Sequence, residues 1–238
     1  MAIQSLDRLG TLSLSKRLER FVAALLAITN HNMSTLSYIY RFEPGTKAGA
    51  HPLLLLHGTG GNENDLLPLG RQLAPGSALL SPRGDVSEHG MPRFFRRFAE
   101  GVFDLDDVAR RTHALAEFII AAGAKYGFEP GQLTAFGYSN GANIAASLLL
   151  LRPEVLARAV LLRPMVVLEP AQLPDLSGKH VSLLSGRHDP IVPVDHPPRL
   201  ADMFRRAGAR VDLHWLEAGH QLTQADLAQA AGFFATKS

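Results

Sequence analysis

The segment LTAFGYSNGANIAASLLLL, residues 133–151, decides the fold. Residues 133–138 have the apolar and small side chains of a buried strand, and residues 140–151 those of a buried helix. The tight connection between them carries the G-x-S-x-G pattern, with Ser139 at its centre and small residues that let the helix approach the strand. An ordinary glycine-rich turn is the alternative for this segment alone. With its flanking elements, the segment predicts a nucleophilic serine on a strained strand-to-helix turn.

From residue 36 onward, short apolar runs alternate with longer segments of helical period. This alternation is typical of a doubly wound, mostly parallel α/β sheet with helices on both faces. A chain of 238 residues with 46% hydrophobic content can bury one large core, so we expect a single domain. The predicted strands are Leu36–Phe42, Leu53–Leu56, Ala78–Ser81, Leu133–Tyr138, Ala159–Leu162, Val181–Leu184 and Val211–Leu216.

Two helices have clear end signals. Asp104 is a good N-cap for a helix that ends near Gly127. Its buried stripe is predicted to contain Leu105, Val108, Thr112, Leu115, Ile119 and Ala122. Asp195 precedes two prolines at the start of a second helix, which stops at Gly208. The stretch 82–101 is predicted to be irregular, and its length favours a role as a wall of the active site.

A serine hydroxyl needs a base to take its proton and an acid to orient that base. The strand Val181–Leu184 leads to Asp189, and the strand Val211–Leu216 leads to His220. Catalytic groups of open α/β sheets lie at the carboxyl ends of the strands. The order Ser139, Asp189, His220 therefore predicts a catalytic triad. Asp195 is the alternative acid, although a helix N-cap position would account for it without catalysis.

The run His57-Gly58-Thr59-Gly60-Gly61 directly follows the strand Leu53–Leu56. Acyl transfer needs backbone N–H donors for the oxyanion, and glycines let a loop turn towards the substrate. We expect the N–H groups of Thr59 and Asn140 to form this oxyanion hole. A phosphate-binding loop is the alternative, but the run lacks both the Walker ending and the G-x-G-x-x-G pattern.

Substrate contacts are predicted from the same loop and from residues 93–98, where three arginines interleave with three phenylalanines. The cluster of Arg93, Arg96 and Arg97 could pair with a carboxylate or phosphate on the substrate, with Arg93 and Arg96 as the candidates for direct contact. The alternative is a short helical turn with its aromatic side chains inside and its arginines in water. His57 and Gly58 are the other candidates for substrate contact.

The composition excludes several classes of protein. Zero cysteines exclude disulfides, thiolate metal sites and a cysteine nucleophile, and a net charge of +2 does not favour nucleic acid as a partner. His57, His188 and His220 have no paired metal-ligand spacing, so the sequence predicts no metal site.

Five stretches together carry a family resemblance. They are LLLLHGTGGNENDLLPL (53–69), RGDVSEHGMPRFFRR (83–97), GYSNGANIAASLLL (137–150), SGRHDPIVP (185–193) and AGHQLT (218–223). They resemble the carboxylesterase/phospholipase branch of the α/β-hydrolases, which includes acyl-protein thioesterases, and most closely a subgroup of small bacterial hydrolases without cofactors. The resemblance implies an α/β-hydrolase fold and esterase or thioesterase chemistry. It also implies that Ser139, Asp189 and His220 are the triad.

The chain departs from better-known esterases at Thr59 and Asn140, where many relatives carry other small or polar residues. Substrate identity therefore does not transfer by analogy. We expect a serine hydrolase that cleaves a small carboxylic ester or thioester through an acyl-enzyme. The alternatives are a non-catalytic ligand-binding protein of this fold, or a stress-related enzyme acting on quinones or aromatic compounds, as the subgroup has been linked to quinone stress. A dienelactone hydrolase normally has cysteine at the elbow and is disfavoured.

Residues 1–33 are predicted to be an N-terminal extension, helical around Ser15–Ile28 or poorly ordered, with the hydrolase domain at residues 34–238. The apolar run at 21–28 is too short to span a bilayer and lacks the cleavage site of a signal peptide. We therefore expect no membrane span and a cytoplasmic location. The oligomeric state is left open, a homodimer included.

Overall fold

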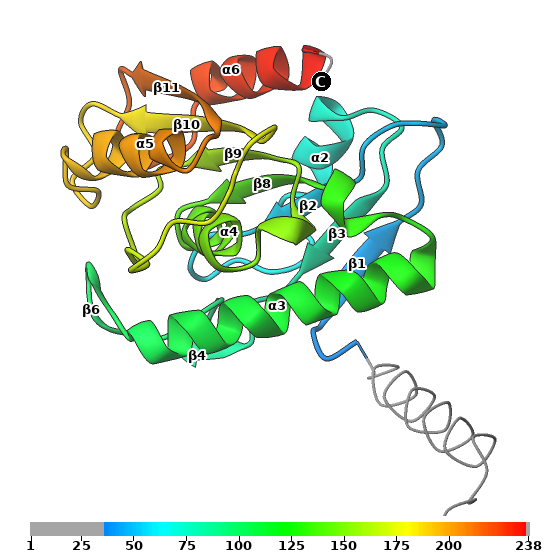
Figure 1. The fold of residues 1–238 in the computed structure, drawn as a ribbon, viewed down its shortest axis with the longest axis horizontal. Helices are drawn as coiled ribbons and strands as arrows, with labels where there is room; N and C mark the ends of the chain where they lie inside the picture. Colours follow the sequence, from blue (N-terminus) through cyan, green and yellow to red (C-terminus); the bar gives the residue numbers. More distant parts are fainter. Residues whose placement is uncertain (1–35, 237–238) are drawn as a thin grey trace, which may run out of the picture. The chain divides into compact units, whose positions relative to one another are not determined.

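The computed structural model of the chain describes residues 36–236, and the predictions for residues 1–33 lie outside this range. Its central sheet has seven strands in the order β1-β3-β2-β8-β9-β10-β11, and only the edge strand β1 is antiparallel (Figure 1). The doubly wound, mostly parallel sheet predicted from the sequence is confirmed. The strands are β1 (Tyr40–Glu43), β2 (Leu53–Leu56), β3 (Leu79–Pro82), β8 (Thr134–Tyr138), β9 (Arg158–Leu162), β10 (His180–Gly186) and β11 (Arg210–Leu216).

Helices cover both faces of this sheet. Figure 1 shows α2 and α6 on one face and α3 and α4 on the other. The strands are apolar on both faces because both are covered, which is why their sequences read as continuous apolar runs. The helices are α2 (Leu67–Leu73), α3 (Leu105–Tyr126), α4 (Asn140–Leu151), α5 (His196–Arg206) and α6 (Gln224–Ala235), with short 3-10 turns at Pro130–Gln132 and Pro153–Val155.

The predicted ends of α3 and α5 are largely confirmed. Asp104 caps α3 by accepting a hydrogen bond from the Asp107 N–H, and α3 ends at Gly127 in the left-handed conformation with φ +74°. Leu105 was wrongly predicted to be buried; it is the first residue of the helix and its side chain is exposed. Asp195 lies at the N-cap position of α5, but its side chain makes no cap hydrogen bond and instead pairs with Arg199.

The prediction that residues 82–101 are irregular is wrong. Residues 82–103 contain two short hairpins. These pair β4 (Val86–Glu88) with β5 (Met91–Arg93) and β6 (Arg97–Ala99) with β7 (Val102–Phe103). The first hairpin turns at His89 and Gly90, both with positive φ, as a two-residue hairpin loop requires. The dipeptides His89-Gly90 and Glu100-Gly101, each with glycine at a turn, were the sequence signal for these hairpins.

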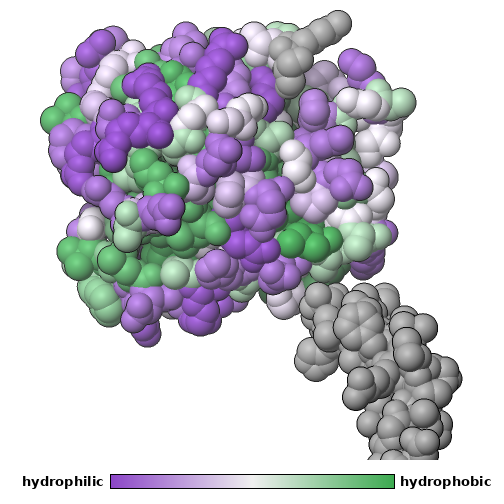
Figure 2. All heavy atoms as spheres, in the orientation of Figure 1, coloured by the Kyte–Doolittle hydropathy of each residue, from purple (hydrophilic) through white to green (hydrophobic). Residues whose placement is uncertain are grey.

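The hairpins lie at the carboxyl edge of the sheet and carry exposed apolar side chains. Phe98 and Val102 are exposed on the β6–β7 hairpin, and Ile191 and Val194 on the loop after β10. Figure 2 shows apolar side chains gathered on the side of the molecule where β6 lies in Figure 1. Among residues 36–236, no helix is long and apolar enough to cross a membrane.

Candidate active site

Ser139 stands between β8 and α4 in a strained backbone conformation, with φ +52° and ψ −113°. A non-glycine residue with positive φ is costly, and such strain persists only where the surroundings impose it. Here the Ser139 N–H donates to the Leu162 carbonyl at 2.8 Å, which ties the turn to the neighbouring strand β9. The turn lifts the Ser139 side chain above the carboxyl edge of the sheet.

The two glycines of the motif are required by close backbone contacts. A Cβ on Gly137 would lie 2.6 Å from the Gly141 carbonyl oxygen, and one on Gly141 would lie 2.0 Å from the Leu56 oxygen. Real Cβ atoms do not approach backbone so closely. The small residues of G-x-S-x-G therefore let α4 lie directly against β2 and β8, as the sequence predicted.

Three predicted catalytic side chains meet above this turn. His220 Nε2 lies 2.9 Å from Ser139 Oγ, and His220 Nδ1 lies 2.8 Å from Asp189 Oδ2. The Asp189 side chain is buried, and its Oδ1 accepts the N–H groups of Ile191 and Val192. The carboxylate thus holds the imidazole while its second oxygen is anchored to its own loop. Asp195, the alternative acid, is exposed and paired with Arg199.

The two N–H groups predicted for the oxyanion hole flank the serine. Among residues 36–236, neither the Thr59 nor the Asn140 backbone N–H donates to another residue. Their side chains are anchored to β5 and its following loop: Thr59 Oγ1 accepts from Arg93 Nη1 at 2.6 Å, and Asn140 Oδ1 accepts from the Phe94 N–H at 2.7 Å. These two side-chain hydrogen bonds fix the positions of Thr59 and Asn140, and with them the two backbone N–H groups.

His57 and Gly58, predicted to contact substrate, support the loop that carries Thr59. His57 is buried, and its Nε2 accepts the Gly84 N–H at 2.9 Å, so the ring proton is on Nδ1, which donates to the Gly58 carbonyl. Burial lowers the pKa of His57 and favours this neutral ring. A Cβ on Gly58 would lie 2.9 Å from the Tyr138 ring, so glycine lets the loop pack on it. Neither residue lines the pocket at Ser139.

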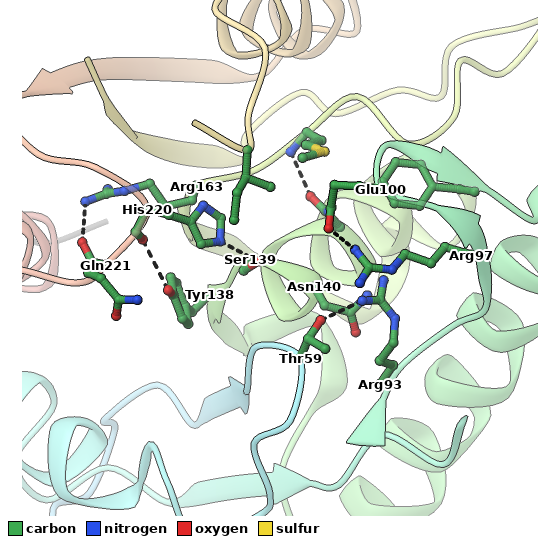
Figure 3. A pocket seen from close by; sticks show the side chains of 14 residues that line it. Thr59, Arg93, Arg97, Glu100, Tyr138, Ser139, Asn140, Arg163, His220 and Gln221 are labelled. Carbon is green, nitrogen blue, oxygen red and sulfur yellow. Dashed lines mark hydrogen bonds and ion pairs between the residues drawn. The ribbon is translucent and has the colours of Figure 1, made fainter. Parts of the chain in front are cut away.

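The pocket at Ser139 has a volume of about 250 Å³ and a mixed lining. Figure 3 shows Arg93, Arg97 and Glu100 on one side of Ser139, and His220 with Arg163 on the other. Its apolar lining comes from Phe103, Met165, Ile191 and the Tyr138 ring.

Arg96 was predicted to contact substrate, but it does not line this pocket. Its guanidinium pairs with the Asp104 carboxylate, and its side chain is 63% exposed. Arg93 ends β5 and Arg97 begins β6, and both line the pocket, whereas Arg96 lies in the segment between the two hairpins and pairs with Asp104. The alternative of a helical turn is wrong, because residues 93–98 form no helix. Arg97, the third arginine of the predicted cluster, does line the pocket. Its Nε donates to Glu88 at 2.9 Å, and its Nη1 pairs with Glu100.

Arg93 is almost completely buried, and burial lowers its pKa. Its Nη1 donates to Thr59 and lies 3.3 Å from a Glu88 oxygen, and its Nε donates to the Phe95 carbonyl. Among the described residues, its Nη2 has no hydrogen-bond partner. A buried guanidinium with an uncommitted donor at a pocket wall can bind an acceptor on a ligand.

Arg163 and Tyr138 also line the pocket and were missed from the sequence. A charged residue directly after the apolar strand Ala159–Leu162 was the only sequence signal for Arg163. The Tyr138 hydroxyl donates to the His220 carbonyl at 3.1 Å, and burial raises the pKa of Tyr138.

The chain is similar in sequence and structure to proteins of one family. Residues 41–238 match the phospholipase/carboxylesterase family. The chain is 47% identical over 193 residues to a protein of Bacillus subtilis (strain 168) named "Putative hydrolase MhqD", covering 81% of this chain and 96% of that protein.

Among solved structures, a Bacillus cereus carboxylesterase has a TM-score of 0.80 and 46% identity, covering 82% of this chain and 92% of its own. YahD, solved with malic acid, has a TM-score of 0.77 and 31% identity, covering 81% and 96%. The strained serine turn, the sheet topology and these matches agree, and the chain belongs to the phospholipase/carboxylesterase family of α/β-hydrolases.

Proposed function

We propose that this chain hydrolyses esters or thioesters of small carboxylic acids through a Ser139–His220–Asp189 triad. The observation that supports the proposal most is the continuous hydrogen-bond series from the Asp189 carboxylate through the His220 ring to the Ser139 hydroxyl. Asp189 accepts a hydrogen bond from the His220 Nδ1–H, so the ring proton is on Nδ1 and the unprotonated Nε2 faces the serine.

In this mechanism Ser139 Oγ attacks the substrate carbonyl while His220 Nε2 takes the hydroxyl proton. The negative charge on the carbonyl oxygen is bound by the Thr59 and Asn140 N–H groups, which have no other acceptor among the described residues. His220 then gives its proton to the departing alcohol or thiol, leaving an acyl ester on Ser139. A water molecule, deprotonated by His220, releases the acid and restores the serine.

The test is hydrolysis of small aryl esters by single-residue variants. Ser139→Ala is expected to lower kcat by about 10⁴-fold or more while the folded state is retained, because the nucleophile is removed and the core is not. His220→Ala is expected to have a similar effect. His188→Ala is the matched control, because His188 is a neighbouring histidine that pairs with Glu217 at the surface.

Labelling with a fluorophosphonate probe separates an enzyme from a ligand-binding protein of the same fold. The unmodified chain is expected to be labelled at Ser139 and the Ser139→Ala variant to remain unlabelled. Full turnover by Ser139→Ala would refute the triad. A folded parent chain that neither reacts with the probe nor hydrolyses any ester of a panel varying in acyl length and leaving group would favour the binding protein.

For the substrate, we propose that Arg93, with Arg97 beside it, binds an oxygen acceptor on the acyl group, in particular a carboxylate. The uncommitted Nη2 donor of the buried Arg93 supports this proposal, and so does the relative YahD, which was solved with the dicarboxylic acid malate. Arg97 is already paired with Glu88 and Glu100, so Arg93 is expected to contribute the stronger contact.

The measurement is the ratio of kcat/KM for a carboxylated ester to that for its neutral analogue. Arg93→Met is expected to lower this ratio by about 10-fold or more, the value of one charge-assisted hydrogen bond. A loss common to both esters would report instead on Thr59, which Arg93 also supports. Arg96→Ala is the matched control, and an unchanged ratio in Arg93→Met would disprove the anionic substrate.

A further inference from the structure

Arg163 is the largest fully buried side chain of the described residues, and it lies at the active site. It directly follows β9, has a positive φ of +56°, and donates its N–H to the Leu184 carbonyl of β10 at 2.8 Å. This left-handed residue turns the chain at the end of the strand. Figure 3 shows its side chain running past His220 towards Gln221, away from Ser139.

The Arg163 guanidinium holds the main chain on both sides of His220. Its Nε donates to the Gly219 carbonyl at 2.8 Å, and its Nη2 donates to the Gln221 carbonyl at 3.1 Å. The carbonyl between them, that of His220, accepts the Tyr138 hydroxyl. Three consecutive carbonyl oxygens of the histidine loop therefore each have a buried or half-buried side-chain donor.

Asp226 forms a buried ion pair with the Arg163 guanidinium. Its fully buried carboxylate accepts Arg163 Nη1 at 2.7 Å and Nη2 at 2.9 Å. Its Oδ2 also accepts the N–H and the hydroxyl of Thr223, which makes Asp226 part of the capping box at the start of α6. The negative charge needed to bury the guanidinium thus comes from the first turn of a helix.

Every donor of Arg163 is used by the protein itself. The single Nε–H goes to Gly219, the two Nη1 hydrogens to Leu184 and Asp226, and the two Nη2 hydrogens to Gln221 and Asp226. A guanidinium has five N–H donors and no acceptor, so none remains for a substrate. Although Arg163 contributes to the pocket wall, its hydrogen bonds are committed to the histidine loop.

We infer that Arg163 is a positioning residue that, with Asp226, holds His220 at hydrogen-bonding distance from Ser139. The inference rests on the proposed role of His220 as the base. The position of the His220 backbone determines where its ring lies. The ring's hydrogen bonds to Asp189 at 2.8 Å and to Ser139 at 2.9 Å therefore depend on that position. A displacement of about 1 Å in a catalytic group can lower the rate about 100-fold.

The test replaces Arg163 with lysine, which keeps a positive charge beside Asp226 but cannot donate to Gly219 and Gln221 together. Arg163→Lys is expected to lower kcat by about 10- to 100-fold and to change KM by less than about two-fold, because no substrate contact is removed. The rate of Ser139 labelling by a fluorophosphonate probe is expected to fall by a similar factor, since the serine depends on the same histidine.

Arg158→Met is the matched control for the loss of a buried arginine. Arg158 lies at the other end of β9 and donates to the Phe233 carbonyl and Thr236 hydroxyl near the end of α6, without contacting the histidine loop. It is expected to lower Tm and to keep kcat and the labelling rate. All rates are measured well below the Tm of each variant. The double variant Arg163→Met/Asp226→Asn gives a second measurement. It removes both charges of the buried ion pair, so no unpaired charge is left in the core.

The outcomes separate this inference from the proposed function. Parental kcat and labelling in both Arg163→Lys and the double variant, with an inactive Ser139→Ala, would refute the positioning role alone. A rise in KM alone would instead make Arg163 a substrate contact, and an equal loss of kcat in Arg158→Met would make the effect one of general stability. An active Ser139→Ala variant would overturn the proposed function itself.

Discussion

Gly141 lies where α4 crosses the end of β2, and its backbone leaves no space for a side chain. A Cβ there would lie 2.0 Å from a backbone oxygen, so the helix would have to move. Gly141→Ala is expected to lower the free energy of unfolding by about 3 kcal/mol and to reduce activity, because the helix start carries the Asn140 N–H. Urea denaturation and ester hydrolysis measure the two effects.

The matched control is Gly232→Ala in α6, where an added Cβ would have no atom within 4 Å. Alanine is expected to stabilise this helix position by about 0.5–1 kcal/mol, because glycine is the poorer helix former. A similar loss of stability in both variants would contradict the steric explanation for Gly141.

His57 gives the protein a dependence of stability on pH. Its Nε2 accepts the Gly84 N–H only while unprotonated, and burial lowers its pKa from the usual 6.5. Between the folded and unfolded pKa values the unfolded chain binds more protons, so stability falls as pH drops below about 6.5. Its contribution is fully present above that pH.

His57→Gln is therefore expected to be less stable at pH 7.5 but to show a smaller fall in stability between pH 7 and 5. Burial also lowers the pKa of His196, whose Nδ1 accepts the Val166 N–H, so His57→Gln/His196→Gln is expected to flatten the profile further. Thermal denaturation across this range is the measurement. An unchanged slope in both variants would show that other groups cause the acid lability.

At the scale of the element, two helices begin with aspartate, but only one uses it as a cap. Asp104 accepts the Asp107 N–H at the start of α3, whereas the Asp195 side chain makes no cap bond at the start of α5. Asp104→Ala is expected to lower Tm by about 2–4 °C, the effect of a lost cap in a domain of this size. Asp195→Ala is expected to shift Tm by less than about 1 °C.

Asp195→Ala also tests the choice of catalytic acid. Because Asp195 is paired with Arg199 at the surface, kcat is expected to remain at the parental value, whereas Asp189→Asn is expected to lower it by about 10⁴-fold. A large loss of kcat in Asp195→Ala would reverse the assignment of the acid.

At the scale of the whole molecule, the sheet and the proposed site are contained in residues that begin at Tyr40. The family match begins at residue 41 and the first sheet strand at Tyr40. A chain of residues 34–238 is therefore expected to keep the Tm of the sheet domain and the kcat/KM of the full chain. Thermal denaturation and ester hydrolysis test this, and a lost activity would show that residues 1–33 contribute to the site.

The main elements could be predicted from the sequence because their signals are local. The strand Leu53–Leu56 was predicted with its observed ends, and Gly127 ends α3 because only a left-handed residue suits that position. The 82–103 region was missed because each hairpin strand has only two or three residues, which is too short for a periodic pattern. Which arginines of this region face the pocket could therefore not be predicted from the sequence.

The sequence by itself determined the sheet and the approximate site of Ser139, Asp189 and His220. Parallel strands carry the residues that follow them to one edge, whatever the details of packing. Tertiary structure decided which arginines face the pocket and what surrounds the histidine. Arg163 meets Gly219 and Asp226 across 56 and 63 residues of chain, and no local pattern encodes a contact that forms only when three strands and a helix have packed together.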